Sequence, residues 1–151
     1  MTFATSTRTT CGFSGSLPEK VESGEQRVAS MANKSQSFRD VVVWQKAHAF
    51  TLAIYRCTEP FPRHELFALT SQLRRAASSV PSNFVEGFRK RTRPDKLRFY
   101  NIAQGSADEC LYQLILAHDL GYTDTTQLQM DLQEVSRLLQ GYMNGLERDG
   151  S

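Results

Sequence analysis

The sequence predicts an all-α protein folded as an antiparallel, up-down-up-down four-helix bundle. Four segments between Val41 and Leu146 repeat apolar residues at spacings of three and four, which is the period of an amphipathic helix. Proline, glycine or a capping pattern separates each segment from the next, and the connections are short enough to make neighbouring helices antiparallel. The alternating pattern typical of a half-buried strand is absent from the sequence.

The length and composition fit one soluble domain. With 151 residues the chain can build a single hydrophobic core without staples. No apolar run reaches the roughly 18 residues that span a bilayer, and the chain does not open as a signal peptide would. The three cysteines, Cys11, Cys57 and Cys110, form neither a disulfide framework nor a metal knuckle, and the last two fall on helical stripes as buried thiols. We expect a cytoplasmic protein without a cofactor.

The first 37 residues differ from the rest of the chain. They are rich in Ser, Thr and Gly and show no sustained apolar period. Such a segment cannot bury enough apolar surface to offset the entropy lost on ordering. We therefore predict a disordered N-terminal tail over residues 1–37 and a four-helix bundle over residues 38–148. Met31 is a reasonable alternative start.

The first helix is predicted from about Val41 to Thr58. Its apolar stripe consists of Val43, Ala47, Phe50, Ile54 and Cys57, widened by Trp44 and Tyr55. The two prolines of residues 59–62 end this helix because proline cannot continue the hydrogen-bond ladder. His48 lies one turn from Trp44 and is expected at the edge of the core rather than in a ligand site.

The second helix is predicted to start near His64. Its stripe consists of Leu66, Leu69, Leu73, Ala76, Val80, Phe84 and Gly87. Pro81 lies inside this helix, and its ring should clash with the carbonyl of Ala77 and leave that carbonyl without its helical partner. We expect a kink at this position, eased by a nearby serine hydroxyl (Ser78, Ser79 or Ser82).

A capping box opens the third helix. Thr92 is followed three residues later by Asp95, Pro94 occupies the first turn, and Leu120 and Gly121 end the helix. One stripe contains Phe99, Ala103, Ser106, Cys110, Leu114 and Ala117, and a second contains Tyr100, Ala107, Leu111 and Ile115. Two apolar faces exceed the need of a lone bundle, so this helix is also predicted to be buried against another subunit.

The fourth helix is predicted to begin with Asp124 as its cap and Gln127 three residues later. Its stripe contains Leu128, Leu132, Val135, Leu139, Tyr142 and Leu146. Gly145, Asp149 and Gly150 should let its end fray.

Charge divides the chain into two halves. From Phe38 to Arg98 there are twelve basic residues against five acidic ones, a net charge of +7. From Phe99 onward two arginines oppose eight acidic residues, a net charge of −6. Copies of the protein could therefore dock basic half to acidic half.

The strongest functional signal is a run of basic residues around the second connection. Six positive charges fall within ten residues, and two more lie earlier on the same helix: Arg74, Arg75, Arg89, Lys90, Arg91, Arg93, Lys96 and Arg98. Such a set could neutralise several phosphates of a nucleic acid. Tyr100 and Phe99 could stack on bases, although Phe99 also fits the core stripe. A solvated turn that limits aggregation is an equally good interpretation of composition alone.

Catalytic motifs are missing. The sequence has no Glu-x-x-His pair for a di-iron site, and His48, His64 and His118 have no second histidine four residues on. It has no phosphate loop and no nucleophile elbow. Glu86 and Glu109 are candidates for acid and base, but helix-surface carboxylates are common. We therefore expect a protein that is not an enzyme.

Three segments carry a resemblance to a known family. They are FRDVVVWQKAHAFTLAIY, FPRHELFALTSQLRRAASSVPSNFVEGFRKR and LRFYNIAQGSADECLYQLILAHDLGY. In this order and at this spacing they closely resemble the four-helix-bundle proteins encoded in intervening sequences of bacterial 23S rRNA genes, from Phe38 to about Leu146. Two departures are Val85, where the family often has alanine, and the sequence FRK at residues 88–90 in place of a common Phe-Gly-Arg. The second makes the turn more basic.

The resemblance implies an assembly and a class of function. It implies a homopentamer, and related proteins include accessory proteins of diversity-generating retroelements, which bind nucleic acid and a reverse transcriptase through a basic surface. The expected function is thus a non-catalytic, homopentameric protein that binds nucleic acid through phosphate contacts, with RNA slightly favoured over DNA. The alternative is a protein-interaction scaffold, such as an accessory subunit of a reverse transcriptase or another nucleic-acid enzyme.

Overall fold

The structure is a computed structural model that describes residues 35–149, and every regular element in this part of the chain is helical. Two short 3-10 helices and four α-helices follow one another: η1 Phe38–Asp40, α2 Val42–Thr58, η2 Arg63–Glu65, α3 Leu69–Arg89, α4 Arg93–Asp119 and α5 Thr126–Arg148. The prediction of an all-α chain with four long helices is confirmed. The predicted tail lies outside the described residues except for residues 35–37, of which Ser37 caps η1 through a hydrogen bond from the N–H of Arg39 (3.3 Å).

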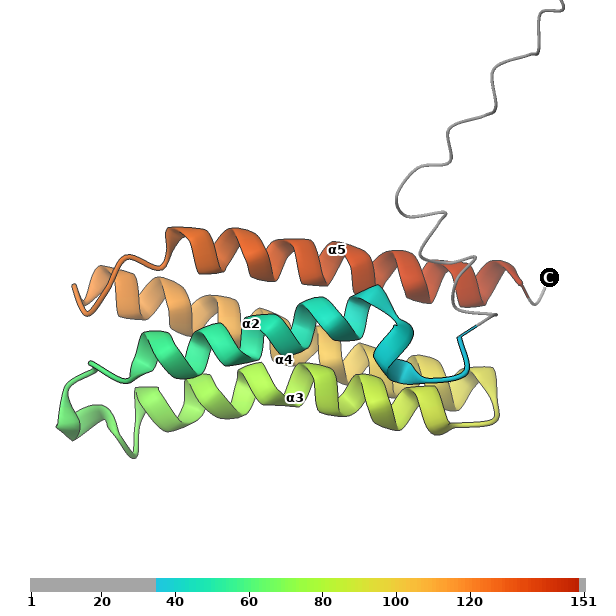
Figure 1. Ribbon diagram of the computed structural model, residues 1–151, viewed down its shortest axis with the longest axis horizontal. Helices are drawn as coiled ribbons and strands as arrows, with labels where there is room; N and C mark the ends of the chain where they lie inside the picture. The colour runs from blue at the N-terminus through green and yellow to red at the C-terminus, as the bar shows by residue number, and fades with distance from the viewer. Residues whose placement is uncertain (1–34, 150–151) are drawn as a thin grey trace, which may run out of the picture.

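The four long helices run side by side, and each one reverses the direction of the one before it (Figure 1). α3 packs against α2 and α4, and α5 packs against α4 and α2. The α2–α3 and α4–α5 connections therefore lie at one end of the bundle, which we call the α2–α3 end. The α3–α4 connection, η1 and the last turns of α5 lie at the other, which we call the α3–α4 end.

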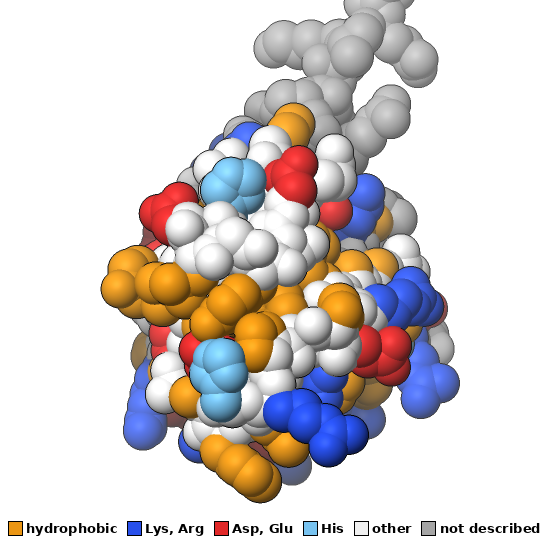
Figure 2. Space-filling view, turned by 90° about the vertical axis from the view of Figure 1, so that its left-hand side faces the viewer, with side chains coloured by type: hydrophobic (Ala, Val, Ile, Leu, Met, Phe, Trp, Pro, Cys, Tyr) orange, Lys and Arg blue, Asp and Glu red, His pale blue; other side chains and the backbone are white. Residues whose placement is uncertain are grey.

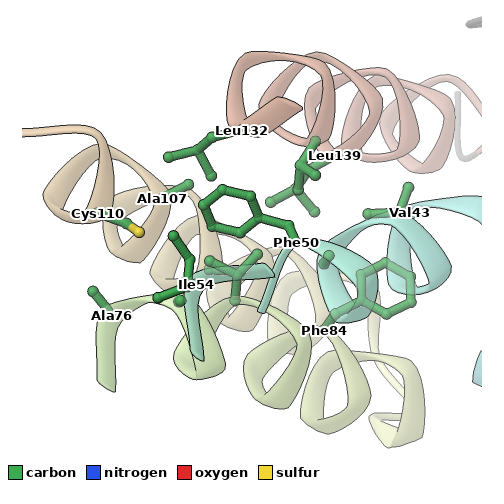
Figure 3. Close-up of a cluster of buried hydrophobic side chains, with 14 of the residues drawn as sticks. Val43, Phe50, Ile54, Ala76, Phe84, Ala107, Cys110, Leu132 and Leu139 are labelled. Atoms are coloured by element: carbon green, nitrogen blue, oxygen red, sulfur yellow. The ribbon is translucent and has the colours of Figure 1, made fainter. Parts of the chain in front are cut away.

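The predicted apolar stripes form the core. Val43, Phe50 and Ile54 of α2 point between the helices toward side chains of the other three, as Figure 3 shows. Their labelled neighbours in this view are Ala76, Phe84, Ala107, Cys110, Leu132 and Leu139. Each of these side chains is buried, so each helix turns its stripe inward as an amphipathic helix in a bundle must.

α3 begins one turn later than the sequence predicted. Residues Arg63–Glu65 form η2, and Ala68, with φ −116° and ψ −110°, interrupts the helical backbone before Leu69. The Glu65 carboxylate caps the delayed start, because its Oε2 accepts a hydrogen bond from the N–H of Leu69 (3.2 Å). Its Oε1 accepts a second one from the hydroxyl of Tyr122 (2.8 Å), which ties the α2–α3 connection to the segment after α4.

Pro81 lies within a continuous α3, but the predicted partner of its orphaned carbonyl is wrong. The hydroxyl of Thr51, on α2, lies 3.0 Å from the carbonyl oxygen of Ala77 and 2.9 Å from that of Ala47. The three serines make other bonds: Ser78 donates to the Arg75 carbonyl, Ser82 to the Ser78 carbonyl, and Ser79 lies 2.8 Å from the Ser106 hydroxyl. The hydrogen-bond partner of the Ala77 carbonyl therefore comes from the neighbouring helix α2 and not from a serine of α3.

The ends of α4 follow the sequence, whereas the start of α5 does not. Thr92 caps α4 by accepting a hydrogen bond from the N–H of Asp95 (3.3 Å). Gly121 follows the helix with a φ of 75°, a backbone conformation that favours glycine. α5 starts at Thr126 without the predicted capping box: Asp124 accepts from the N–H of Thr126 (2.9 Å), and Gln127 pairs with Asp131 instead (2.8 Å).

The two apolar stripes of α4 are largely used within one chain. Tyr100 and Ala107 of the second stripe are buried, as is most of the first, because α4 packs against both α3 and α5. Three larger apolar side chains of α4 stay exposed: Ile102 (44 %), Tyr112 (64 %) and Ile115 (40 %). Packing of α4 against two helices thus explains much of the apolar surface that the sequence assigned to another subunit.

Cys110 and His48 lie where the sequence placed them, whereas Cys57 is less buried than expected. Cys110 is fully buried, and burial raises the pKa of its thiol to about 12. Cys57 is only half-buried, and burial raises the pKa of this thiol as well. His48 stacks on Trp44 with ring centroids 5.0 Å apart, at the edge of the core. Cys11 lies outside the described residues.

Candidate nucleic-acid interface

The α3–α4 connection is a tight, well-capped turn. α3 ends at Arg89 and α4 begins at Arg93. Lys90 closes α3 by donating its N–H to the Gly87 carbonyl (3.1 Å), and the hydroxyl of Thr92 contacts the Asp95 carboxylate (2.5 Å) while Thr92 caps α4. Because both helix ends are fixed, the side chains between them project from a defined backbone.

A close helix approach holds this turn together. Gly87 faces the ring of Tyr100, so that a Cβ at position 87 would lie 2.5 Å from the Tyr100 Cε1 atom. The Tyr100 ring is fully buried and stacks on Phe84 with centroids 5.2 Å apart. Only glycine leaves room for this ring between α3 and α4. The predicted role of Tyr100 in stacking on bases is therefore wrong, because a buried ring cannot reach a base.

Four of the predicted basic residues extend from this turn into solvent. Arg89, Arg91, Arg93 and Arg98 are exposed, and none has a carboxylate partner within residues 35–149. The two acidic residues that flank the turn in the chain have other partners: the Asp95 carboxylate contacts the Thr92 hydroxyl, and the Glu86 carboxylate lies 3.8 Å from the Lys90 ammonium group. These four guanidinium groups are therefore available to an external anion.

Two further residues of the predicted set mainly support the turn. The Nζ of Lys96 donates to the Phe88 carbonyl at the end of α3 (2.8 Å), and burial lowers its pKa. Lys90 lies over the ring of Phe99, 4.7 Å from the centroid. The Phe99 ring is thus half-buried and covered by the Lys90 ammonium group, and it does not lie in the core. Both lysines add positive charge here, but their ammonium groups already have partners.

Sequence reasoning missed one arginine. Arg39 precedes α2 and is far from the basic run in the chain, but its neighbour Phe38 packs on Phe88 (centroids 6.5 Å) and on Trp44 (5.1 Å). Arg39 is exposed, and its guanidinium lies 5.9 Å from the Phe38 centroid. We call Arg39, Arg89, Arg91, Arg93 and Arg98 the basic cluster. The signal available in the sequence was the predicted antiparallel topology, which places the start of the first helix at the same end as the second connection (Figure 1).

Arg74 and Arg75 do not join the basic cluster. Arg75 precedes Arg89 by fourteen residues, which is about 21 Å along a helix that rises about 1.5 Å per residue. The guanidinium of Arg74 folds onto the end of α2, where Nε donates to the Thr58 hydroxyl (2.8 Å) and the group lies 4.8 Å from the Tyr55 ring centroid. Arg75 is exposed in a polar pocket between α3 and α4 that also contains Glu109.

The two carboxylates considered for catalysis lie apart in different surroundings. Glu86 is exposed beside Lys90, whereas Glu109 accepts a hydrogen bond from Gln113 (3.1 Å) at the edge of the Arg75 pocket. Within residues 35–149 no three His, Cys, Asp or Glu side chains are grouped so that they could hold a metal ion. None of the described helices is both long and apolar enough to cross a bilayer.

The fold and this surface together define a class: a small all-α bundle with a cluster of exposed arginines at one end. The model of the 23S rRNA-intervening sequence protein family matches residues 39–141. The chain therefore belongs to the 23S rRNA-intervening sequence protein family, as its sequence motifs suggested.

A solved structure supports the same assignment. The chain is similar to a protein of unknown function from the S23 ribosomal protein family of Bacteroides thetaiotaomicron, with a TM-score of 0.61 and 26% sequence identity. The match covers 68% of this chain and 98% of that one. No curated protein matches the sequence significantly.

Proposed function

We propose that the protein binds nucleic acid through phosphate contacts made by the basic cluster, without catalysing a reaction. The observation that carries this proposal is that Arg89, Arg91, Arg93 and Arg98 are all exposed around one turn and have no carboxylate partner within residues 35–149. Like charges held together repel one another, and an anion that approaches them relieves this repulsion. A phosphate backbone supplies closely spaced anions in the right number.

The proposed contacts position the nucleic acid but read little sequence. Arginine guanidinium groups bind phosphate oxygens with good geometry, whereas base reading requires side chains that enter a groove or stack on bases. The two aromatic residues that the sequence suggested for stacking are not available, since the Tyr100 ring is buried and Lys90 covers the Phe99 ring. We favour RNA over DNA because the family is named for a ribosomal RNA intervening sequence.

Assembly as a homopentamer is part of the proposal. Ile102, Tyr112 and Ile115 leave apolar surface on α4 that a second copy could cover. Five copies around an axis would bring five basic clusters together, and linked weak sites bind much more tightly than single ones. The opposite net charges of the two halves of the chain would favour docking between copies.

A charge-matched pair of variants tests the binding site. The first variant changes Arg89, Arg91 and Arg93 to glutamine, and the second changes three exposed arginines elsewhere, Arg56, Arg75 and Arg137, in the same way. Both variants carry three fewer positive charges than wild type. Binding to a structured RNA and to a DNA duplex is measured by fluorescence anisotropy at several salt concentrations.

We expect the first variant alone to show weaker affinity and a weaker salt dependence. The slope of log K against log salt should fall by about 0.7–0.9 for each phosphate that the variant no longer neutralises. The control should stay close to wild type. Equal effects in the two variants would mean that net charge, not the basic cluster, attracts the nucleic acid, and the absence of any binding by wild type at low salt would reject the function.

A second candidate function is a scaffold for a protein partner, such as a reverse transcriptase or another nucleic-acid enzyme. It is favoured by apolar side chains at the α2–α3 end, where Phe67 is 91 % exposed and Leu66 is 48 % exposed. Exposed apolar groups of this size are typical of protein-binding surfaces. A partner that stays bound after nuclease treatment, and is released by Phe67→Ser but not by the triple arginine variant, would support the scaffold.

A further inference from the structure

A pocket opens at the α2–α3 end, on the opposite side of the molecule from the basic cluster. Its volume is about 460 Å³, and it lies between the last turn of α2, the α2–α3 connection and the first turns of α3. Phe61, Pro62 and Leu66 give it apolar walls. Figure 2 faces this end and shows hydrophobic side chains spread across it, with Lys and Arg side chains at its lower edge. Its size falls within the range of pockets that bind small molecules.

A fixed guanidinium lines this pocket. Arg74 donates from Nε to the Thr58 hydroxyl (2.8 Å) and from Nη2 to the Tyr55 carbonyl (3.4 Å), and it packs over the Tyr55 ring. These bonds use only part of its donor set, and within residues 35–149 no carboxylate pairs with it. Arg74 therefore presents an oriented positive charge with unused N–H donors to the pocket.

A buried hydroxyl in the same pocket also lacks a partner among the described residues. Thr70 is 3 % exposed, and its Oγ1 makes no hydrogen bond within this part of the chain. A buried hydroxyl without a partner is costly, so a ligand or a water molecule that supplies a partner would be favourable at this position. The hydroxyl can donate a hydrogen bond, as Arg74 can. An occupant that satisfies both must offer acceptor oxygens.

The other charges limit the charge of the occupant. Arg63 lines the pocket and is exposed without a carboxylate partner in the described part of the chain, whereas Glu59 adds one negative charge. Glu65 stands nearby, already bound to the Tyr122 hydroxyl and the Leu69 N–H. Two guanidinium groups against the one carboxylate that lines the pocket leave a net charge of +1, which suits a singly charged anion better than a doubly charged phosphate.

We propose that this pocket binds a small monocarboxylate with a hydrophobic body. The carboxylate oxygens would accept hydrogen bonds from Arg74 and Thr70, since a planar guanidinium matches the geometry of a carboxylate. The hydrophobic body would lie against Phe61, Pro62 and Leu66. This site is separate from the basic cluster, so it does not depend on the proposed nucleic-acid binding.

The probe is 4-phenylbutyrate, titrated into the full-length, isotope-labelled protein and followed by amide NMR spectra. Two compounds serve as controls: 4-phenylbutanamide keeps the hydrophobic body without the charge, and acetate keeps the charge without the body. We expect saturable shifts at Leu66, Thr70 and Arg74 with the acid at millimolar or lower concentration. The amide and acetate should each bind at least about tenfold more weakly.

Three variants locate the groups that bind the acid. Thr70→Val removes the hydroxyl at nearly constant volume, and Arg74→Gln removes the guanidinium. Arg75→Gln is the matched control. It removes the same charge from the next residue in the chain, and the Arg75 side chain lines a different pocket. We expect Thr70→Val and Arg74→Gln to weaken binding of the acid by about tenfold each. Arg75→Gln should bind as wild type.

Two results would overturn the proposal. One is the absence of saturable binding of 4-phenylbutyrate to the wild-type protein. The other is binding that Thr70→Val leaves unchanged and that Arg74→Gln and Arg75→Gln weaken equally, which would show a general effect of charge. Thr70→Val keeps the test valid if Arg74→Gln disturbs the end of α2, because the Thr70 hydroxyl makes no bond within the described protein.

Discussion

Two buried threonines show how the same side chain can support the fold or remain available. The hydroxyl of Thr51 contacts the carbonyl that Pro81 leaves open in α3, whereas the hydroxyl of Thr70 has no partner within residues 35–149. Removing a donor from a buried carbonyl leaves that carbonyl unsatisfied, but removing a hydroxyl that has no partner relieves a cost. Valine at these two positions should therefore have opposite effects on stability.

We expect Thr51→Val to lower the free energy of unfolding by about 1–3 kcal/mol. Thr70→Val should leave it unchanged or raise it by up to about 1 kcal/mol. Urea denaturation of the two variants measures both values. In a Pro81→Ala background the Ala77 carbonyl regains a backbone donor, so Thr51→Val should cost less there. A cost that is the same in both backgrounds would show that Thr51 acts through packing alone.

Two helical glycines provide a second matched comparison. A Cβ at Gly87 would lie 2.5 Å from the Tyr100 ring, whereas a Cβ at Gly105 meets nothing within 4 Å. Gly87→Ala should lower stability by about 1–3 kcal/mol because the buried ring must move. Gly105→Ala should raise it by about 0.5–1 kcal/mol because alanine favours the helix. Thermal unfolding of both variants tests this contrast, and equal effects would contradict it.

Contacts between residues on different helices could not be predicted from the sequence pattern. The open carbonyl of Ala77 could be predicted from Pro81 alone, because proline affects a known position four residues earlier. The donor could not, because Thr51 is 26 residues away and reaches Ala77 only through the packing register of α2 on α3. Likewise, Gly87 belonged to the predicted stripe, but nothing in the pattern paired it with Tyr100.

At the scale of elements, the start of α3 depends on a contact with the far end of α4. Glu65 caps α3 and accepts a hydrogen bond from Tyr122, which follows α4. These two bonds lower the pKa of Glu65 below its ordinary value, with the Tyr122 hydroxyl as the larger cause. Periodicity placed the start one turn too early because Leu66 fits the stripe, whereas the helical backbone is interrupted at Ala68 and α3 begins at Leu69.

This contact predicts a pH dependence. Because the folded-state pKa of Glu65 is lowered, its ionised form stabilises the fold above the unfolded pKa, and this contribution disappears as pH falls through the folded pKa. Tyr122→Phe removes the hydrogen bond but keeps the ring contact with Phe61. The variant should be less stable than wild type near neutral pH, and the difference should shrink in acid. Urea midpoints at about pH 7 and about pH 3 measure it.

Other acidic groups do not obscure this comparison. The pKa of Asp124 is also lowered, by its hydrogen bonds with Thr126, but this group is present in both proteins and cancels in the difference. A difference between wild type and Tyr122→Phe that does not change with pH would mean that the hydroxyl of Tyr122 stabilises the fold independently of the charge on Glu65.

At the scale of the whole molecule, the two ends of the bundle differ in chemistry. The α3–α4 end carries the basic cluster, and the α2–α3 end carries exposed apolar side chains and the pocket. The sequence indicated the basic cluster through its dense run of positive charges. It also assigned Arg74 and Arg75 to this surface, because they lie on the same helix as Arg89. It missed Arg39, which the antiparallel order of the helices brings to this end (Figure 1) and the packing of Phe38 on Phe88 brings close to α3.

The exposed apolar side chains of α4 predict that copies of the chain assemble. We expect light scattering to give five times the mass of the chain. A Tyr112→Lys, Ile115→Lys double variant should dissociate into smaller species, because lysine cannot be buried in an apolar interface without a large cost. Gln133→Lys, an exposed position on α5, is the control and should keep the assembly. A monomeric wild-type protein would refute the homopentamer, whereas dissociation of both variants would point to a general charge effect.

The bond from Thr51 to Ala77 also bears on how the protein comes to be folded. In α3 alone the Ala77 carbonyl has no hydrogen-bond donor, because Pro81 lacks an N–H and Thr51 belongs to α2. An isolated α3 peptide should therefore fray near its middle. During synthesis α2 leaves the ribosome first and can supply the donor as soon as α3 follows. We therefore expect the α2–α3 hairpin to acquire native order that α3 alone does not.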